Sequence, residues 1–151
     1  MVNFIRTVML DLDIAKSRLY GKKLTLIIVK NGEVLFETGS HRISGFLGAI
    51  EQLGAGLEDA SVADRVAGKA IALLCVYAKI SDVYAEVLSE KAKAVFEENG
   101  IHQKWKELVK NVLDLNKKGV CPFETLAADI SDPKDAYRKF KALQSSLKAC
   151  K

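Results

Sequence analysis

The sequence predicts an α/β fold, a three-layer α/β/α sandwich on a mixed sheet of four or five strands. Asn31-Gly32 between two β-rich segments is the strongest short signal for a β-hairpin, because both turn positions need positive φ. Residues 70–78 are apolar on every face of a helix, which predicts a buried central helix. The β-rich residues 82–88 and 101–109 flank a helical segment, the order of a parallel pair with a right-handed crossover.

Two helices flank the predicted hairpin. Residues 4–20 place apolar side chains at helical spacing, so they predict an amphipathic helix. The hairpin strands are expected at residues 24–30 and 33–38. Residues 43–53 are weakly helical, and Gly54-Ala55-Gly56 predicts a loop after them.

The buried helix has an expected start of its own. Ser61-Val62-Ala63-Asp64 has the spacing of a capping box, in which the Ser hydroxyl accepts from a first-turn amide and the acidic side chain reaches back. We therefore expect the helix to begin here and to carry Arg65 and Lys69 on its first turns. Gly68 inside a helix would be unfavourable by about 1 kcal/mol, which indicates close approach of another backbone or a ligand.

Start and stop signals define the remaining helices. Ser89-Glu90 caps a helix that ends at Asn99-Gly100. After a polar turn at residues 116–119, Cys121-Pro122 opens a short helix. Ser131-Asp132-Pro133 opens the last one.

Length and composition predict a single domain over residues 1–151. The net charge of +4 is spread along helices, so we expect no nucleic-acid partner. We expect no membrane partner, because no signal peptide opens the chain and the longest apolar run is too short to cross a bilayer. Three cysteines without a Cys-x-x-Cys pair predict reduced thiols in a cytoplasmic protein. The oligomeric state is left open, a homo-oligomer included.

Cys121 has the setting that most favours chemistry. It precedes Pro122, which favours the first helical position, so Cys121 is the expected N-cap. A thiol there faces the free amides and the positive end of the helix dipole, which favour the nucleophilic thiolate. Glu124, at the third helical position, either caps the same helix or transfers protons for the thiol. Cys121 itself is either functional or simply a small buried residue.

A second group of candidates lies at the expected start of the buried helix. Asp64 and Lys69 would line the edge of a crevice, with Gly68 and Ser61 as ligand-binding neighbours. The structural alternatives are a capping role for Asp64 and a solvated face for Lys69. Ser89 starts another helix whose amides would bind an anionic or polar ligand. In open α/β sheets such helix starts converge beyond the strand ends.

Several familiar sites are absent from the sequence. It has no G-x-x-x-x-G-K-[ST] loop, no G-x-G-x-x-G and no G-x-S-x-G, which excludes the standard triphosphate, dinucleotide and hydrolase classes. His41 and His102 lie far apart without a metal-ligand spacing, so we expect both at the surface and expect neither a metal nor another cofactor. Cys75 and Cys150 receive no catalytic role.

Four segments carry a resemblance to a known family: Ala60-Ser61-Val62-Ala63-Asp64-Arg65-Val66-Ala67-Gly68-Lys69-Ala70, then Leu73-Leu74-Cys75, then Val83-Tyr84-Ala85 with Ser89, then Gly119-Val120-Cys121-Pro122-Phe123-Glu124. They resemble an uncharacterised family of small bacterial and archaeal proteins, a domain of unknown function similar in fold to the cytidine deaminases. The resemblance covers residues 20–140. It implies a deaminase-like order of helix, hairpin, buried helix and strand-helix-strand units.

The resemblance does not extend to zinc chemistry. A zinc deaminase has His or Cys, then Ala-Glu, at the start of the buried helix and Pro-Cys-x-x-Cys at the next helix. The corresponding places here read Val62-Ala63-Asp64-Arg65 and Leu88-Ser89-Glu90-Lys91-Ala92, without a zinc-ligand set. Cys121-Pro122 has the reverse order and follows the last predicted strand.

Two function hypotheses follow. The first is a zinc-free, cysteine-dependent enzyme acting on a small nucleoside- or amide-like substrate. In it Cys121 is the nucleophile, Asp64 or Glu124 moves protons, and Lys69 offsets negative charge. The alternative is a non-catalytic module that binds a small anionic or nucleotide-like ligand at the helix starts, with Cys121 structural or redox-sensitive.

Overall fold

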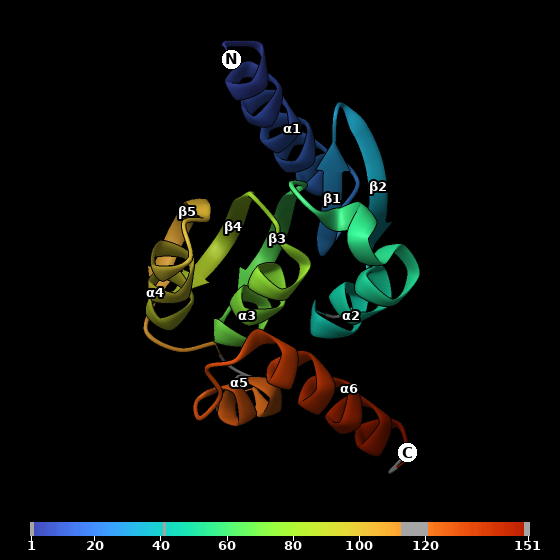
Figure 1. Ribbon diagram of the computed structural model, residues 1–151, viewed down its shortest axis with the longest axis vertical. Coiled ribbons are helices and arrows are strands. Elements are labelled where there is room, and N and C mark those ends of the chain that lie inside the picture. The colour runs from blue at the N-terminus through green and yellow to red at the C-terminus, as the bar shows by residue number, and fades with distance from the viewer. Residues whose placement is uncertain (1, 41, 113–120, 150–151) are drawn as a thin grey trace.

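The computed structural model describes the backbone of residues 2–40, 42–112 and 121–149. Its elements in chain order are α1 (Val2–Gly21), β1 (Leu26–Lys30), β2 (Glu33–Thr38), α2 (Arg42–Leu53), η1 (Gly54–Leu57), β3 (Ser61–Ala67), α3 (Lys69–Ala78), β4 (Asp82–Ser89), α4 (Glu90–Glu98), β5 (His102–Val109), α5 (Pro122–Ala127) and α6 (Pro133–Ala149). The five strands form one mixed sheet in the order β2-β1-β3-β4-β5 (Figure 1). The strands β3, β4 and β5 are parallel, and β1 is antiparallel to both β2 and β3.

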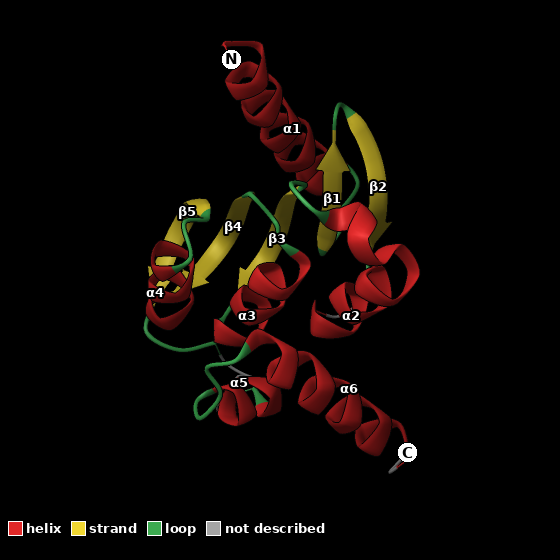
Figure 2. Ribbon diagram, in the orientation of Figure 1, coloured by secondary structure: helices red, strands yellow, loops and turns green. Residues whose placement is uncertain are grey.

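Helices cover both faces of this sheet (Figure 2). On one face α1 packs Leu12, Ala15 and Leu19 against Ile27 and Val29 of β1. On the other face α2, α3 and α4 share a larger core with the alternate residues of the strands. The helices α5 and α6 pack on the outer side of α3. The predicted α/β/α sandwich on a mixed sheet is therefore confirmed, with five strands.

The predicted hairpin is also confirmed, and α1 holds its turn. Asn31 and Gly32 have φ of 54° and 80°, the positive values that the turn requires. The carboxylate of Asp11 accepts hydrogen bonds from both turn amides, at 2.8 Å from Asn31 and 2.7 Å from Gly32. Asp11 is buried, so these two bonds replace the hydrogen bonds to water that its carboxylate loses on folding.

The expected helix start at Ser61 is wrong, because residues 61–67 form strand β3. This strand pairs with β1 on one side and β4 on the other, so it is the central strand of the sheet. Backbone pairing on both sides of residues 61–64 outweighs a local capping box. The buried helix α3 starts instead at Lys69, and Gly68 is its N-cap in extended conformation.

Most other predicted elements are confirmed, including α1, α2, α3, β4, α4, β5, α5 and α6. The segment after α2 is a short 3-10 helix and not an open loop. The predicted polar turn at residues 116–119 lies outside the described residues. Within the part of the chain that the structure describes, no helix has both the length and the apolar character needed to cross a membrane.

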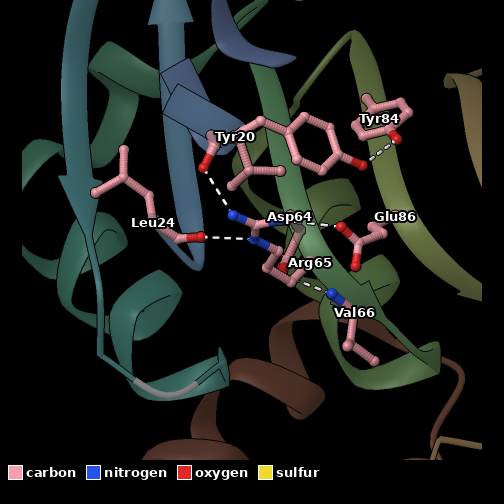
Figure 3. Close-up of polar contacts among 8 residues, drawn as sticks. Tyr20, Leu24, Asp64, Arg65, Val66, Tyr84 and Glu86 are labelled. Carbon is pink, nitrogen blue, oxygen red and sulfur yellow. Dashed lines mark hydrogen bonds and ion pairs between the residues drawn. The ribbon is translucent and has the colours of Figure 1, made fainter. Parts of the chain in front are cut away.

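The guanidinium of Arg65 fastens α1 to the sheet (Figure 3). Its Nε donates to the Leu24 carbonyl at 2.8 Å, and Nη2 donates to the Leu19 carbonyl at 2.9 Å in the last turn of α1. Nη1 lies 2.9 Å from Oε1 of Glu86 on β4, and the guanidinium carbon lies 4.8 Å from the centre of the Tyr20 ring. A cation at a helix C-terminus is favourable. Arg65 is therefore a structural residue of β3.

We predict that Arg65→Met lowers the free energy of unfolding by about 2–4 kcal/mol, because it removes three charge-assisted hydrogen bonds. Urea denaturation measures this change. Arg138→Met is the matched control, since Arg138 is exposed on α6 and, among the residues that the structure describes, pairs with Asp135 alone. Equal losses in the two variants would contradict the role assigned to Arg65.

Candidate functional site

The carboxylate of Glu124 on α5 caps the start of α3. Its Oε2 accepts from the Lys69 amide at 3.0 Å, and its Oε1 accepts from the Ala70 amide at 2.8 Å. These are first-turn amides that have no partner within their own helix. Gly68 makes the approach possible, because a Cβ atom there would lie 2.2 Å from Oε1 of Glu124. The close approach that Gly68 predicted is therefore made by a side chain of the same chain.

Two opposing effects act on the charge of Glu124. Burial raises the pKa of its carboxyl, and this effect is the larger one. The two amides and the nearby ammonium groups of Lys91 and Lys69 lower the pKa and offset part of the rise. Glu124 is thus a partly buried acid in a setting with two lysines.

Lys69 makes the second link between α5 and α3. Its Nζ donates to the carbonyl of Ala128, the C-cap residue of α5, at 3.2 Å. Glu124, in the first turn of α5, is bonded to the start of α3. Both ends of α5 are therefore attached to the first turn of α3.

A cavity of about 370 Å³ lies beside these contacts, between α3, α4 and the connection from α5 to α6. Lys69 and Leu73 line it from α3, and Lys91 and Val95 line it from α4. The connection contributes Ala128, Ile130, Ser131 and Pro133. At the far end of α4, Glu98 and Asn99 complete the wall. The cavity combines two lysines, one acid and several neutral polar groups with an apolar wall.

Cys121 is the N-cap residue of α5, as the sequence predicts, and it is partly exposed. Its side chain makes no capping hydrogen bond, while its amide donates to the Val112 carbonyl at 3.2 Å. Glu124 does not cap α5 but caps α3, so the expected capping of its own helix is wrong. A catalytic role for Cys121 stays a prediction.

Ser61 and Asp64 lie inside β3 and are each only 1% exposed. The Oδ1 atom of Asp64 accepts from the Val66 amide at 3.2 Å (Figure 3). Burial, with a smaller contribution from the charge of Asp64, raises the pKa of the Cys75 thiol well above its ordinary value. Ser61 and Asp64 therefore do not form the edge of a crevice at a helix start.

Ser89 caps α4 as predicted, since its buried Oγ accepts from the Ala92 amide at 3.0 Å. Of the predicted site residues, the structure brings Gly68, Lys69 and Glu124 into contact. Sequence reasoning missed Lys91, which follows Ser89 at the start of α4. The parallel order of β3 and β4 brings the starts of α3 and α4 to the same edge of the sheet, and this rule would have paired Lys91 with Lys69.

His102 is exposed, as expected, but it is not isolated. Its Nδ1 lies 2.6 Å from Oδ1 of the buried Asp82, at the first residues of β5 and β4. Burial raises the pKa of Asp82, and the interaction with His102 offsets part of this rise. His41 lies outside the described residues.

The donor set at the start of α3 and α4 does not suit zinc. In a zinc deaminase the first zinc motif lies at the start of the buried helix. In this structure the buried helix starts at Gly68-Lys69 and not at Ser61, so the motif must be compared with Gly68-Lys69. Neither this start nor Ser89-Glu90 supplies His or Cys. Among the residues described, no group of three or more His, Cys, Asp or Glu side chains is arranged to hold a metal ion.

The fold and this site define an α/β protein with a lysine-lined cavity at the start of two helices. Residues 14–143 match the domain of unknown function DUF1893, and the chain belongs to this family. A crystal structure of a DUF1893 family protein from Thermotoga maritima is similar over 87% of this chain and 88% of that one, with 26% identity and a TM-score of 0.81. No protein of curated function matches the chain.

Two deaminase structures show weaker similarity. A dCMP deaminase from the cyanophage S-TIM5 has 14% identity and a TM-score of 0.46, over 68% of this chain and 96% of that one. A structure from a study of tRNA:A34 deaminases has 17% identity and a TM-score of 0.41, over 84% of this chain and 99% of that one. At these scores neither likeness extends to a site or a reaction.

We predict that Gly68→Ala lowers the free energy of unfolding by about 1–2 kcal/mol, because the new methyl group displaces the Glu124 carboxylate from the α3 amides. In a Glu124→Ala background the same change should bring no further loss, since the cap is already absent. Gly48→Ala is the control. Gly48 is inside α2 with nothing near its missing Cβ, so this change should stabilise by about 0.5–1 kcal/mol. Additive losses from Gly68→Ala and Glu124→Ala would contradict the contact.

We predict a pH signature for the same carboxyl. The folded-state pKa of the Glu124 carboxyl is raised, so protonation of this carboxyl stabilises the fold. The stabilisation is fully present below the ordinary pKa of a glutamate, roughly 4.3. That contribution is lost as pH rises through the raised pKa. The stability of the wild type relative to Glu124→Gln, measured by urea denaturation, should therefore fall as pH increases across this range. A rising difference would mean that the amide bonds outweigh the effect of burial.

Proposed function

We propose that this protein is a binding module for a small anionic ligand, held in the cavity between α3, α4 and residues 128–133. One observation carries the proposal: Lys69 and Lys91 come from two neighbouring helices and line the same cavity of about 370 Å³. This volume falls in the range of small-molecule sites, roughly 300–1,000 Å³.

The surroundings of the two lysines support an anion as ligand. Lys91 has no ion-pair partner among the described residues, and Lys69 uses one donor on a neutral carbonyl. Glu124 lies near both lysines, and its two oxygens are engaged by the α3 amides. A bound anion would therefore lie beside the α3 start and not on its amides. Glu98 is the acid on the cavity wall, so the two lysines there exceed it by one charge. Asn99 and Ser131 offer neutral hydrogen-bonding groups that would fix its orientation.

The cysteine-dependent reaction is the second candidate function. It is supported by the partial exposure of Cys121 and by its N-cap position at the start of α5. Asp64 is buried and Glu124 is engaged with α3, so both would have to leave their present partners to move protons. Alkylation by iodoacetamide tests this candidate: with a lowered thiol pKa, of about 7.5 or less, the rate levels off by about pH 8. A rate that still rises steeply between pH 8 and pH 9, as for an ordinary thiol, would contradict it.

We further place the module in the cytoplasm. The described cysteines, Cys75 and Cys121, are free thiols, which fits a reducing compartment.

We predict that pyrophosphate or citrate, used as probe anions, raises the melting temperature of the protein and binds in isothermal titration calorimetry. Lys91→Met should weaken this binding about tenfold, equal to about 1.4 kcal/mol, because it removes one ammonium from the cavity wall. Lys93→Met is the matched control, since Lys93 is on the same helix but pairs with Glu97 outside the cavity. Equal weakening by both variants, or no binding of either probe, would contradict the proposal.

A further inference from the structure

The cavity between α3 and α4 has two ends of opposite charge. Lys91 and Glu98 both line it from α4, one in the first turn of the helix and one at its last residue. At a rise of 1.5 Å per residue they are about 10 Å apart along the helix axis. Lys69 lies at the Lys91 end, since both ammonium groups act on the charge of Glu124. The cavity is therefore positive at one end and negative at the other.

The hydrogen-bonding groups follow the same division. The ammonium groups of Lys69 and Lys91 can only donate hydrogen bonds. At the other end the carboxylate of Glu98 can only accept them, and this residue is exposed. Beside it, Nδ2 of Asn99 donates to the Val95 carbonyl at 2.8 Å, which leaves the side-chain oxygen of Asn99 as a second acceptor. The Glu98 end thus suits a cation as the lysine end suits an anion.

The two charges on this side of α4 are placed against the helix dipole. The N-terminal end of a helix favours acids and the C-terminal end favours bases, so Lys91 and Glu98 each have the disfavoured sign. The neighbouring Glu97 is offset by its ion pair with Lys93 at 2.8 Å, whereas Glu98 has no ion-pair partner among the described residues. The stability of α4 does not account for these two charges, and a ligand of the opposite polarity would compensate both.

An apolar wall lies along the same cavity. Ala94 is exposed and Pro133 is partly exposed, so both present accessible apolar surface. Leu73, Val95 and Ile130 are the other apolar side chains of the lining that come from α3, α4 and the connection after α5. Such a wall suits a hydrocarbon chain that joins two charged groups.

We propose that the cavity binds a phosphate ester that carries an ammonium group at the far end of an alkyl chain. The phosphate lies between Lys69 and Lys91, and the ammonium donates to the Glu98 carboxylate and to the Asn99 side-chain oxygen. Such a ligand has a net charge of about −1 at neutral pH, and the two lysines exceed Glu98 by one positive charge. This assignment names the ligand class of the proposed anion site and rests on that site.

Isothermal titration calorimetry with two probes tests the ammonium end. Aminohexyl phosphate roughly spans the distance between the two ends when extended. Its N-acetyl derivative keeps the phosphate and the chain but replaces the ammonium by a neutral amide. The amine should bind the wild type about fivefold more tightly than the amide, as expected for one partly exposed ion pair. Glu98→Gln should remove this preference without weakening pyrophosphate.

Glu97→Gln is the matched control, because Glu97 is the neighbour of Glu98 on α4 but pairs with Lys93 and does not line the cavity. It should keep the preference for the amine. The melting temperature of ligand-free Glu98→Gln should not fall, because the change removes a charge that opposes the helix dipole. A lower melting temperature would give Glu98 a structural role and contradict the assignment.

The outcomes separate this assignment from the anion site itself. Equal affinities of the amine and the amide for the wild type, or loss of the preference in Glu97→Gln as well, would overturn the assignment. Pyrophosphate binding that depends on Lys91 would then leave the anion site in place. A wild type that binds neither pyrophosphate nor either probe would overturn the proposed function, and this assignment with it.

Discussion

The contact between Glu124 and the first two amides of α3 is the interaction on which the proposed site depends. It joins α5 to the buried central helix, and the Lys69 ammonium repeats the attachment at the other end of α5. The connection that follows α5 forms one wall of the lysine-lined cavity. Gly68 is required because any side chain there would occupy the position of the carboxylate. The cavity is thus a consequence of how α5 is held.

The cavity of the proposed ligand site arises from one property of the sheet. Helices cover each face only in part, so hollows remain where a helix ends or an edge strand extends past its cover. On the α3 and α4 face, the parallel strands β3 and β4 bring two helix starts to one edge, with a lysine on each. On the other face, Arg65 and Asp11 hold α1 over the hairpin side of the sheet and leave β5 open.

Local signals predicted most of the fold, and long-range contacts account for what they missed. Asn31-Gly32, the apolar run of α3 and the Ser89 cap each act within a few residues, and the sequence located all three. The prediction of a helix start at Ser61-Val62-Ala63-Asp64 was wrong. Its capping-box spacing is a local signal, whereas its strand conformation comes from pairing with β1 and β4 on either side. Glu124 and Ala70 are 54 residues apart in the chain, so no spacing rule pairs them. Gly68 gave the one local sign of that contact.

Amide hydrogen exchange of Lys69 and Ala70 tests the central contact most directly. The first amides of a helix have no partner within it and exchange rapidly when exposed to water. With the Glu124 carboxylate bound to them, both amides should exchange slowly in the wild type, and this protection should be lost in Glu124→Ala while the centre of α3 stays protected. Rapid exchange of both amides in the wild type, or protection that survives in Glu124→Ala, would contradict the account.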